Sequence, residues 1–131
     1  MSGEGPVEPR SGEGAGHEAS ANGSTATARV PTASASRYLQ QLCKHWAHNL
    51  AVEYTAERGT IRFPAEGRAG TFPGDALATL VARDDGLDVR IDASVPEQRG
   101  ALKDVLARHL DRFAFREAPL SFPWRDEADQ G

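Results

Sequence analysis

The strongest constraint on the fold of this 131-residue chain is a break in composition near residue 28. Residues 1–28 consist mainly of Gly, Ser, Ala, Glu, Pro and Thr, and Val7 is the only branched aliphatic residue among them. Such a segment cannot bury enough apolar area to offset the entropy lost on ordering. We therefore predict a disordered tail over residues 1–28, which leaves about 100 residues for one folded domain.

Two amphipathic helices are predicted in the remaining chain. The first spans residues 33–49, because its large apolar residues recur at intervals of one, three and four. These residues are Tyr38, Leu39, Leu42, Cys43, Trp46 and Leu50. The second helix follows Ser94, whose spacing from Glu97 is typical of a capping box. Its apolar stripe comprises Leu102, Val105, Leu106, Leu110 and Phe113.

Between the helices, alternating apolar and polar residues predict four strands in two hairpins. The first hairpin turns at residues 56–59, with Gly59 in a left-handed conformation, and the second turns at residues 84–86. The loop at 64–75 contains three glycines and two prolines and is predicted to lack regular pairing. The predicted fold of residues 29–125 is α+β in the order α-β-β-β-β-α, with both helices on one face of a four-stranded antiparallel sheet. Residues 126–131 form an acidic end.

Composition and charge restrict the partners. The net charge of −4 gives no basic surplus for nucleic acid, and no apolar stretch approaches the roughly 18 residues of a membrane-spanning helix. The first residues lack the basic and apolar regions of a signal peptide. The single cysteine, Cys43, cannot form an internal disulfide, which fits a reducing compartment. We predict a cytoplasmic protein; its oligomeric state is left open.

The first helix places one thiol and two imidazoles within six positions. At about 100° per residue, Cys43 lies about 160° from His45 and about 140° from His48, so the thiol cannot share one ion with either. His45 and His48 are about 60° apart and could do so, but a metal would require ligands from other elements. A metal site and a solvated histidine face are both consistent with this spacing.

Three further features can each be interpreted as structural or as functional. Cys43 falls on the apolar stripe, which favours core packing over nucleophilic chemistry. His109 lies on the buried side of the second helix and could be a core histidine or could meet Cys43 across the helices. Asp104, Arg108 and Arg112 are spaced by four, as in a salt-bridged outer face. Together with Lys44 and His48, this helix could instead present an anion-binding patch.

Two segments are long and distinctive: residues 36–48, SRYLQQLCKHWAH, and residues 109–117, HLDRFAFRE. Together they resemble the bacterial family of unknown function DUF2218, over about residues 29–124. The resemblance implies no established activity. Because members are sometimes encoded beside or fused to siderophore-interacting flavoproteins, it implies such a flavoprotein as a partner and a place in iron or siderophore metabolism. The loop at 64–75 looks longer than the usual connection in the family.

Two hypotheses follow. The first is a non-enzymatic accessory or binding protein that meets an anionic small ligand or a partner protein through one basic surface, made of Lys44, His45, His48, Arg112 and Arg116. The alternative is a metal- or thiol-dependent enzyme that uses Cys43, His45, His48 and His109. The sequence contains no Gly-rich phosphate loop, nucleophile elbow or zinc-type cysteine spacing, and it identifies neither a cofactor nor a metal.

Overall fold

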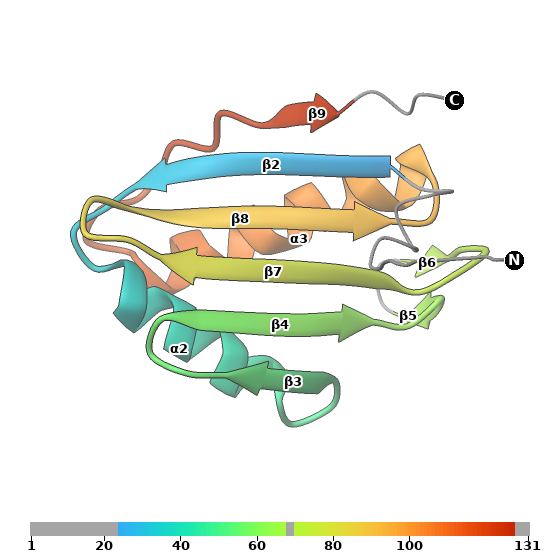
Figure 1. The fold of residues 1–131 in the computed structure, drawn as a ribbon, viewed down its shortest axis with the longest axis horizontal. Coiled ribbons are helices and arrows are strands. Elements are labelled where there is room, and N and C mark those ends of the chain that lie inside the picture. Colours follow the sequence, from blue (N-terminus) through green and yellow to red (C-terminus); the bar gives the residue numbers. More distant parts are fainter. Residues whose placement is uncertain (1–23, 68–69, 128–131) are drawn as a thin grey trace, which may run out of the picture.

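The structure is a computed structural model that describes residues 24–67 and 70–127. Its main sheet has six strands in the order β3-β4-β7-β8-β2-β9, and each neighbouring pair is antiparallel. Both helices cover the same face of this sheet (Figure 1). In chain order the elements are β2 (Ser24–Pro31), α2 (Ala35–Trp46), β3 (Ala51–Tyr54), β4 (Arg58–Phe63), β5 (Glu66–Gly67), β6 (Gly70–Thr71), β7 (Ala76–Ala82), β8 (Gly86–Ala93), α3 (Pro96–Phe113) and β9 (Arg125–Glu127).

The core lies between the sheet and the helices. Strand β8 shows how the alternation of its sequence builds it, because Leu87, Val89 and Ile91 are almost fully buried toward the helices. The apolar stripes of α2 and α3 close the core from the other side, as predicted. Neither of these two helices is long and apolar enough to cross a membrane.

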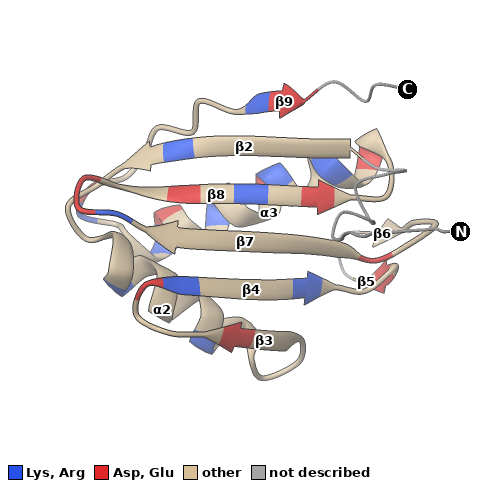
Figure 2. Ribbon diagram, viewed as in Figure 1, with Lys and Arg blue, Asp and Glu red and all other residues tan. Residues whose placement is uncertain are grey.

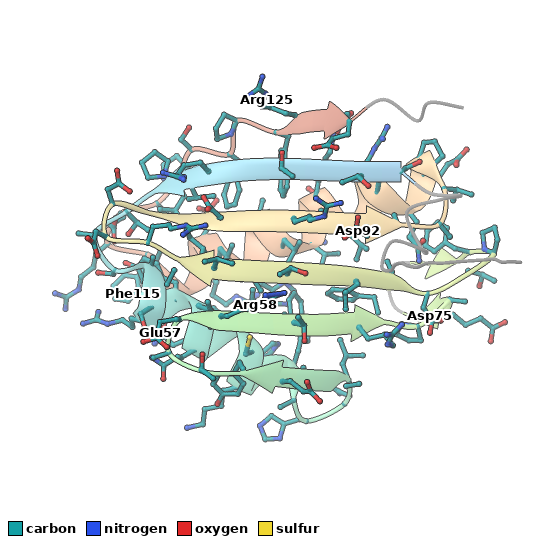
Figure 3. The ribbon with its side chains drawn as sticks, viewed as in Figure 1. Glu57, Arg58, Asp75, Asp92, Phe115 and Arg125 are labelled. Carbon is teal, nitrogen blue, oxygen red and sulfur yellow. The ribbon has the colours of Figure 1, made fainter. Side chains whose placement is uncertain are left out.

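The opposite face of the sheet carries paired charges. Asp88 accepts from Arg29 at 2.5 Å and from Arg83 at 2.9 Å, and Arg90 pairs with Asp92 at 3.0 Å. Charged side chains of β8 alternate in sign along this face, whereas β7 carries none (Figures 2 and 3). The Arg29–Asp88 pair follows the register, because these residues lie opposite each other on β2 and β8, whereas Arg90 and Asp92 share this face as alternate residues of β8.

A four-stranded sheet was predicted, but the main sheet has two more strands, β2 and β9. Strand β2 pairs with β8 over eight positions and begins at Ser24, so residues 24–28 of the predicted tail belong to the sheet. Residues 1–23 lie outside the described part. The strand was not predicted because two of its buried residues on the helix side, Ala26 and Ala28, are too small to give an apolar signal and only Val30 is large. Strand β9 adds three residues to the outer edge of β2, so the acidic end predicted from residue 126 begins within the sheet.

Two predictions about glycine-containing connections are also wrong. The loop at 64–75 contains the small hairpin β5–β6, in which Gly70 has a φ of 136°. Gly59 is a residue of β4 with no positive φ, and its lack of a side chain serves close packing instead. A Cβ added at Gly59 would lie 2.6 Å from the sulfur of Cys43.

The start of α3 differs from the predicted capping box. Its N-cap is Val95, without a side-chain hydrogen bond. Gln98 reaches back instead: its Oε1 accepts from the backbone N–H of Ser94 at 2.7 Å, and its Nε2 donates to the carbonyl of Gly74 at 3.0 Å. Because Gln98 is only 1% exposed, these bonds satisfy a buried amide and tie the loop before β7 to α3.

After α3 the chain runs back along the side of that helix. The N–H of Leu120 donates to Asp111 at 2.8 Å, and the rings of Phe122 and Trp124 stack with centroids 5.9 Å apart. All three apolar residues pack on the core. Asp126 then pairs with Lys103 at 2.5 Å, which fixes β9 beside α3.

Candidate functional site

The antiparallel course of α2 and α3 brings the end of α2 beside the middle of α3. At one end of the helix pair, the hydroxyl of Tyr38 donates to the carboxylate of Glu117, which also accepts from Thr32 at 2.9 Å. Farther along, the imidazoles of His45 and His109 face each other with ring centroids 5.3 Å apart. This crossing positions imidazoles from two helices at one place.

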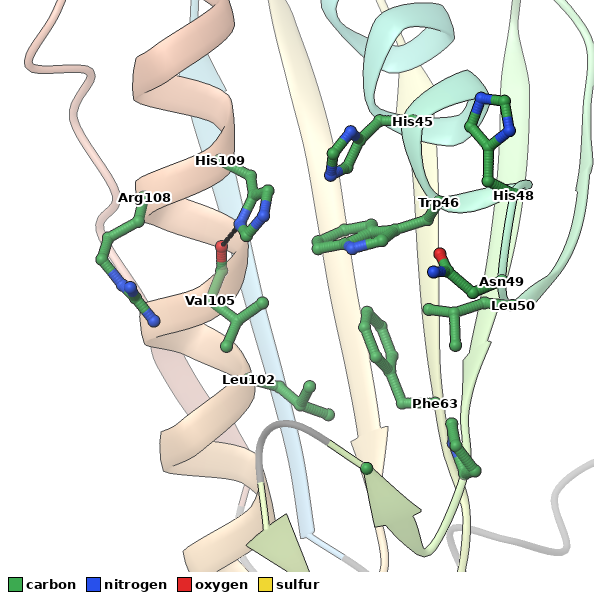
Figure 4. A pocket seen from close by; sticks show the side chains of 12 residues that line it. His45, Trp46, His48, Asn49, Leu50, Phe63, Leu102, Val105, Arg108 and His109 are labelled. Atoms are coloured by element: carbon green, nitrogen blue, oxygen red, sulfur yellow. Dashed lines mark hydrogen bonds between the residues drawn. The ribbon is translucent and has the colours of Figure 1, made fainter.

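A groove of about 690 Å³ opens next to these imidazoles. Its sides are the end of α2 and one face of α3, and the β5–β6 hairpin closes one end (Figure 4). Apolar side chains line much of it, among them Leu50, Leu102 and Val105. Small-molecule sites in proteins are concave and mainly apolar, with a few polar groups.

Trp46 forms the floor of the groove together with Phe63. The two rings meet edge to face, with centroids 5.1 Å apart and planes at 82°. On its other side the indole packs against the ring of His109, with the two ring centroids 4.7 Å apart (Figure 4). Trp46 is 8% exposed, so only a small part of it reaches the groove.

The indole N–H of Trp46 has no acceptor in residues 24–67 or 70–127, where the indole makes ring contacts with His45, Phe63 and His109. Buried donors in proteins are nearly always bonded, and leaving one unpaired costs about 1–3 kcal/mol. Such a donor beside a groove is therefore suited to an acceptor that enters from outside.

The two facing imidazoles have different electrostatic settings. The Nδ1 of His109 lies 2.8 Å from the carbonyl of Val105, which can only accept, so Nδ1 carries a proton and donates it to that carbonyl. Burial lowers the pKa of His45, and the positive charges of His109, Arg112 and His48 lower it further. His45 is thus mainly neutral at pH 7.

The five residues of the predicted basic surface do not all gather at the groove. His45 and His48 line it, and Arg112 lies close enough to His45 to affect its pKa. Lys44 is exposed in the last turn of α2 and does not line the groove. Arg116 follows the end of α3, with its guanidinium 5.6 Å from the ring centroid of Phe115, and it does not line the groove either.

Comparison with known proteins gives the family. A family model described as an uncharacterized protein conserved in bacteria, DUF2218, matches residues 27–125. The chain belongs to this family. It is also similar to PA4090 from Pseudomonas aeruginosa, solved by NMR, with 33% identity over 77% of this chain and 94% of that protein, and a TM-score of 0.60. No curated protein matches.

In this DUF2218 domain, Cys43 is part of the core, as its place on the apolar stripe predicted. It is fully buried, and burial raises the pKa of its thiol to about 11, so the nucleophilic thiolate is scarce at neutral pH. Its sulfur packs toward Gly59, whereas His109 contacts His45 and Trp46. The thiol and the imidazoles are therefore not assembled as a nucleophile and its base.

The metal-dependent alternative finds little geometric support either. The described residues contain no group of three or more His, Cys, Asp or Glu side chains that could hold a metal ion. His45 and His109 lie close together, but His48 is not joined to them in such a group. Zinc sites take at least three protein ligands, so this pair is not a zinc site of the usual kind.

Three contributors to the groove were not predicted from the sequence. Trp46 lies on the predicted apolar stripe and Phe63 in one of the predicted strands, and both are more than nine-tenths buried. Their role at the groove floor depends on the chain folding back at residues 64–67, which no periodicity predicts. Arg108 pairs with Asp104 at 3.2 Å, as their spacing predicted, whereas Arg112 has no ion-pair partner among the described residues; Arg108 also lines the groove.

Proposed function

We propose that this DUF2218 domain is a non-enzymatic binding module whose groove between α2 and α3 holds a small organic anion. The observation that carries the proposal is the indole N–H of the buried Trp46, which has no acceptor among the described residues. An oxygen of an anionic ligand would satisfy this donor, and a hydrogen bond to a charged acceptor is stronger than one to a neutral acceptor.

The charge distribution supports an anion. Helix α2 has two basic residues, Arg37 and Lys44, and no acidic one, while α3 has four basic and three acidic residues. The two helices together are therefore positive by three charges in a chain of net charge −4. Within the described residues, Lys44 and Arg112 have no ion-pair partner. These side chains are available to attract an anion toward the groove.

The family resemblance suggests a specific partner and ligand, which we include in the proposal. A siderophore-interacting flavoprotein would be a partner, and a ferric siderophore with acidic groups would be one ligand to test. A reducing, cytoplasmic setting suits a chain whose one cysteine is a buried free thiol. Lys44 and Arg116 would then contribute to partner binding, since both are exposed away from the groove.

The test is an NMR titration of the ¹⁵N-labelled full chain with carboxylates of increasing size, from acetate to cyclohexanecarboxylate. We expect a saturable shift of the Trp46 indole N–H signal, with the Trp124 indole as an internal reference. The double variant His48→Ala with Arg112→Ala should lose at least about tenfold in affinity while the melting temperature barely changes, because exposed charges contribute little to folding.

A matched control is the variant Arg125→Ala, which removes a cation from the opposite edge of the sheet (Figure 3). Its affinity should equal that of the parent chain. The proposal is wrong if no carboxylate shifts the Trp46 signal, or if the double variant binds as tightly as the control.

A further inference from the structure

We infer that the anion is an aromatic carboxylate, which binds with its ring on Trp46 and Phe63 and its carboxylate at the indole N–H. This inference rests on the proposed function and names the class of ligand. The shape and chemistry of the groove distinguish this class from other anions.

The lining favours a flat apolar body. Trp46 and Phe63 meet at 82°, so the parts of the two rings that line the groove present aromatic surface in two orientations. Aromatic rings pair favourably with both edges and faces at centroid separations of about 4.5–7 Å. The half-buried side chains of Leu50 and Val105 add apolar walls. Inorganic phosphate would lose its hydration in such a groove without replacing most of it.

The polar groups are few and suit one carboxylate. The Trp46 N–H can donate to one oxygen. Arg108 also lines the groove, and its guanidinium, which extends away from Trp46 in Figure 4, would turn toward the other oxygen when the ligand binds. Arg108 is exposed and only paired with Asp104 within its own helix, a contact of little strength. The Nδ1–H of His109 already bonds the carbonyl of Val105, so it does not compete with the Trp46 N–H for the carboxylate.

The first experiment compares three ligands of similar size by calorimetry and NMR on the full chain: benzoate, cyclohexanecarboxylate and benzamide. We expect benzoate to bind at least about fivefold more tightly than cyclohexanecarboxylate, the scale of an aromatic pair. Benzamide, which has the ring without the charge, should bind at least about tenfold more weakly than benzoate.

The outcomes separate this inference from the proposed function. Equal affinities of benzoate and cyclohexanecarboxylate for the same site would overturn the aromatic class and leave the proposed function standing. A failure of every carboxylate to bind would overturn the proposed function itself. Benzamide binding as tightly as benzoate would show that charge is not recognised, which overturns both.

The second experiment tests the indole donor. Trp46→Phe keeps an aromatic ring but removes the N–H, and we expect about tenfold or greater loss of benzoate affinity. Trp124→Phe, which changes the tryptophan beside Lys103, is the control and should bind as the parent chain does. If Trp46→Phe fails to fold, the parent chain still decides: benzoate protons should give nuclear Overhauser effects to the Phe63 ring, and their absence at saturation would refute the proposed pose.

Discussion

Gly59 is the residue whose identity is most tightly set by its neighbours. An added Cβ would lie 2.6 Å from the Cys43 sulfur, 3.1 Å from the Cβ of Tyr54 and 3.4 Å from the Cδ2 of Leu39. Because Cys43 and Leu39 are fully buried, they have little freedom to move. The absence of a side chain at this position therefore lets α2 lie directly on β4.

We expect Gly59→Ala to reduce the free energy of unfolding by about 1–3 kcal/mol, the usual cost of overpacking a core. Gly100→Ala is the matched control, since nothing lies within 4 Å of a Cβ at that helical position, and it should stabilise by about 0.5–1 kcal/mol. Urea denaturation would measure both.

The sulfur of Cys43 is the proposed cause of that cost, which a double variant can test. Cys43→Ala removes the sulfur, so Gly59→Ala should cost less in that background than in the parent chain. A cost that is unchanged by Cys43→Ala would show that the contact with Tyr54 or Leu39 dominates instead.

At the scale of elements, β2 shows where the ordered fold begins. It lies between β8 and β9, so it contributes hydrogen bonds on both of its edges. Residues 24–28 include five of the eight positions paired with β8 and all three positions paired with β9. These residues have the composition of a tail, yet they form the centre of one half of the sheet.

Two truncations should therefore behave differently. Removal of residues 1–23 should leave the melting temperature nearly unchanged, because no described element loses a residue. Removal of residues 1–28 should lower it sharply, since β8 and β9 lose backbone partners and the buried Ala26 and Ala28 are lost from the core. Equal melting temperatures for the two truncations would contradict the role given to β2. Calorimetry on both proteins would measure this.

Sequence patterns predicted elements that have large apolar residues and missed those that do not. The stripe of α2 and the alternation of β8 were read correctly because Leu42 or Ile91 gives a strong periodic signal. Strand β2 has only Val30 as a large apolar residue, and β9 has none. Their pairing depends on backbone hydrogen bonds and on a chain that returns after α3, and neither is visible in local sequence.

At the scale of the whole molecule, the candidate site depends on three segments that are distant in sequence. His45 and His48 were predicted on one face of a helix over residues 33–49; α2 ends at Trp46, so His48 lies two residues beyond it, and both side chains still line the groove. The contact of His45 with His109, rather than of Cys43 with His109, depends on how the two helices cross. A single sequence does not encode that crossing in any periodicity, so the groove could only be found in the fold.

Protonation of His45 should affect folding and ligand binding in opposite directions as the pH falls. His45 faces His109 and Arg112 from α3 and His48 from its own segment, and its pKa is lowered in the folded chain. As the pH falls below about 6.5, the unfolded chain takes up this proton first. The stability contributed by neutral His45 is thus present above that pH and is lost as the pH falls toward the lowered pKa.

An anion in the groove reverses this trend for binding, because a negative charge beside His45 favours its protonated form. We expect the affinity for benzoate to rise between pH 8 and pH 5.5 while the free energy of unfolding of the empty protein falls. His45→Asn should weaken both trends, whereas Arg125→Ala, far from the groove, should leave both unchanged. Affinity that is independent of pH in the parent chain, measured by calorimetry across this range, would place the carboxylate away from His45.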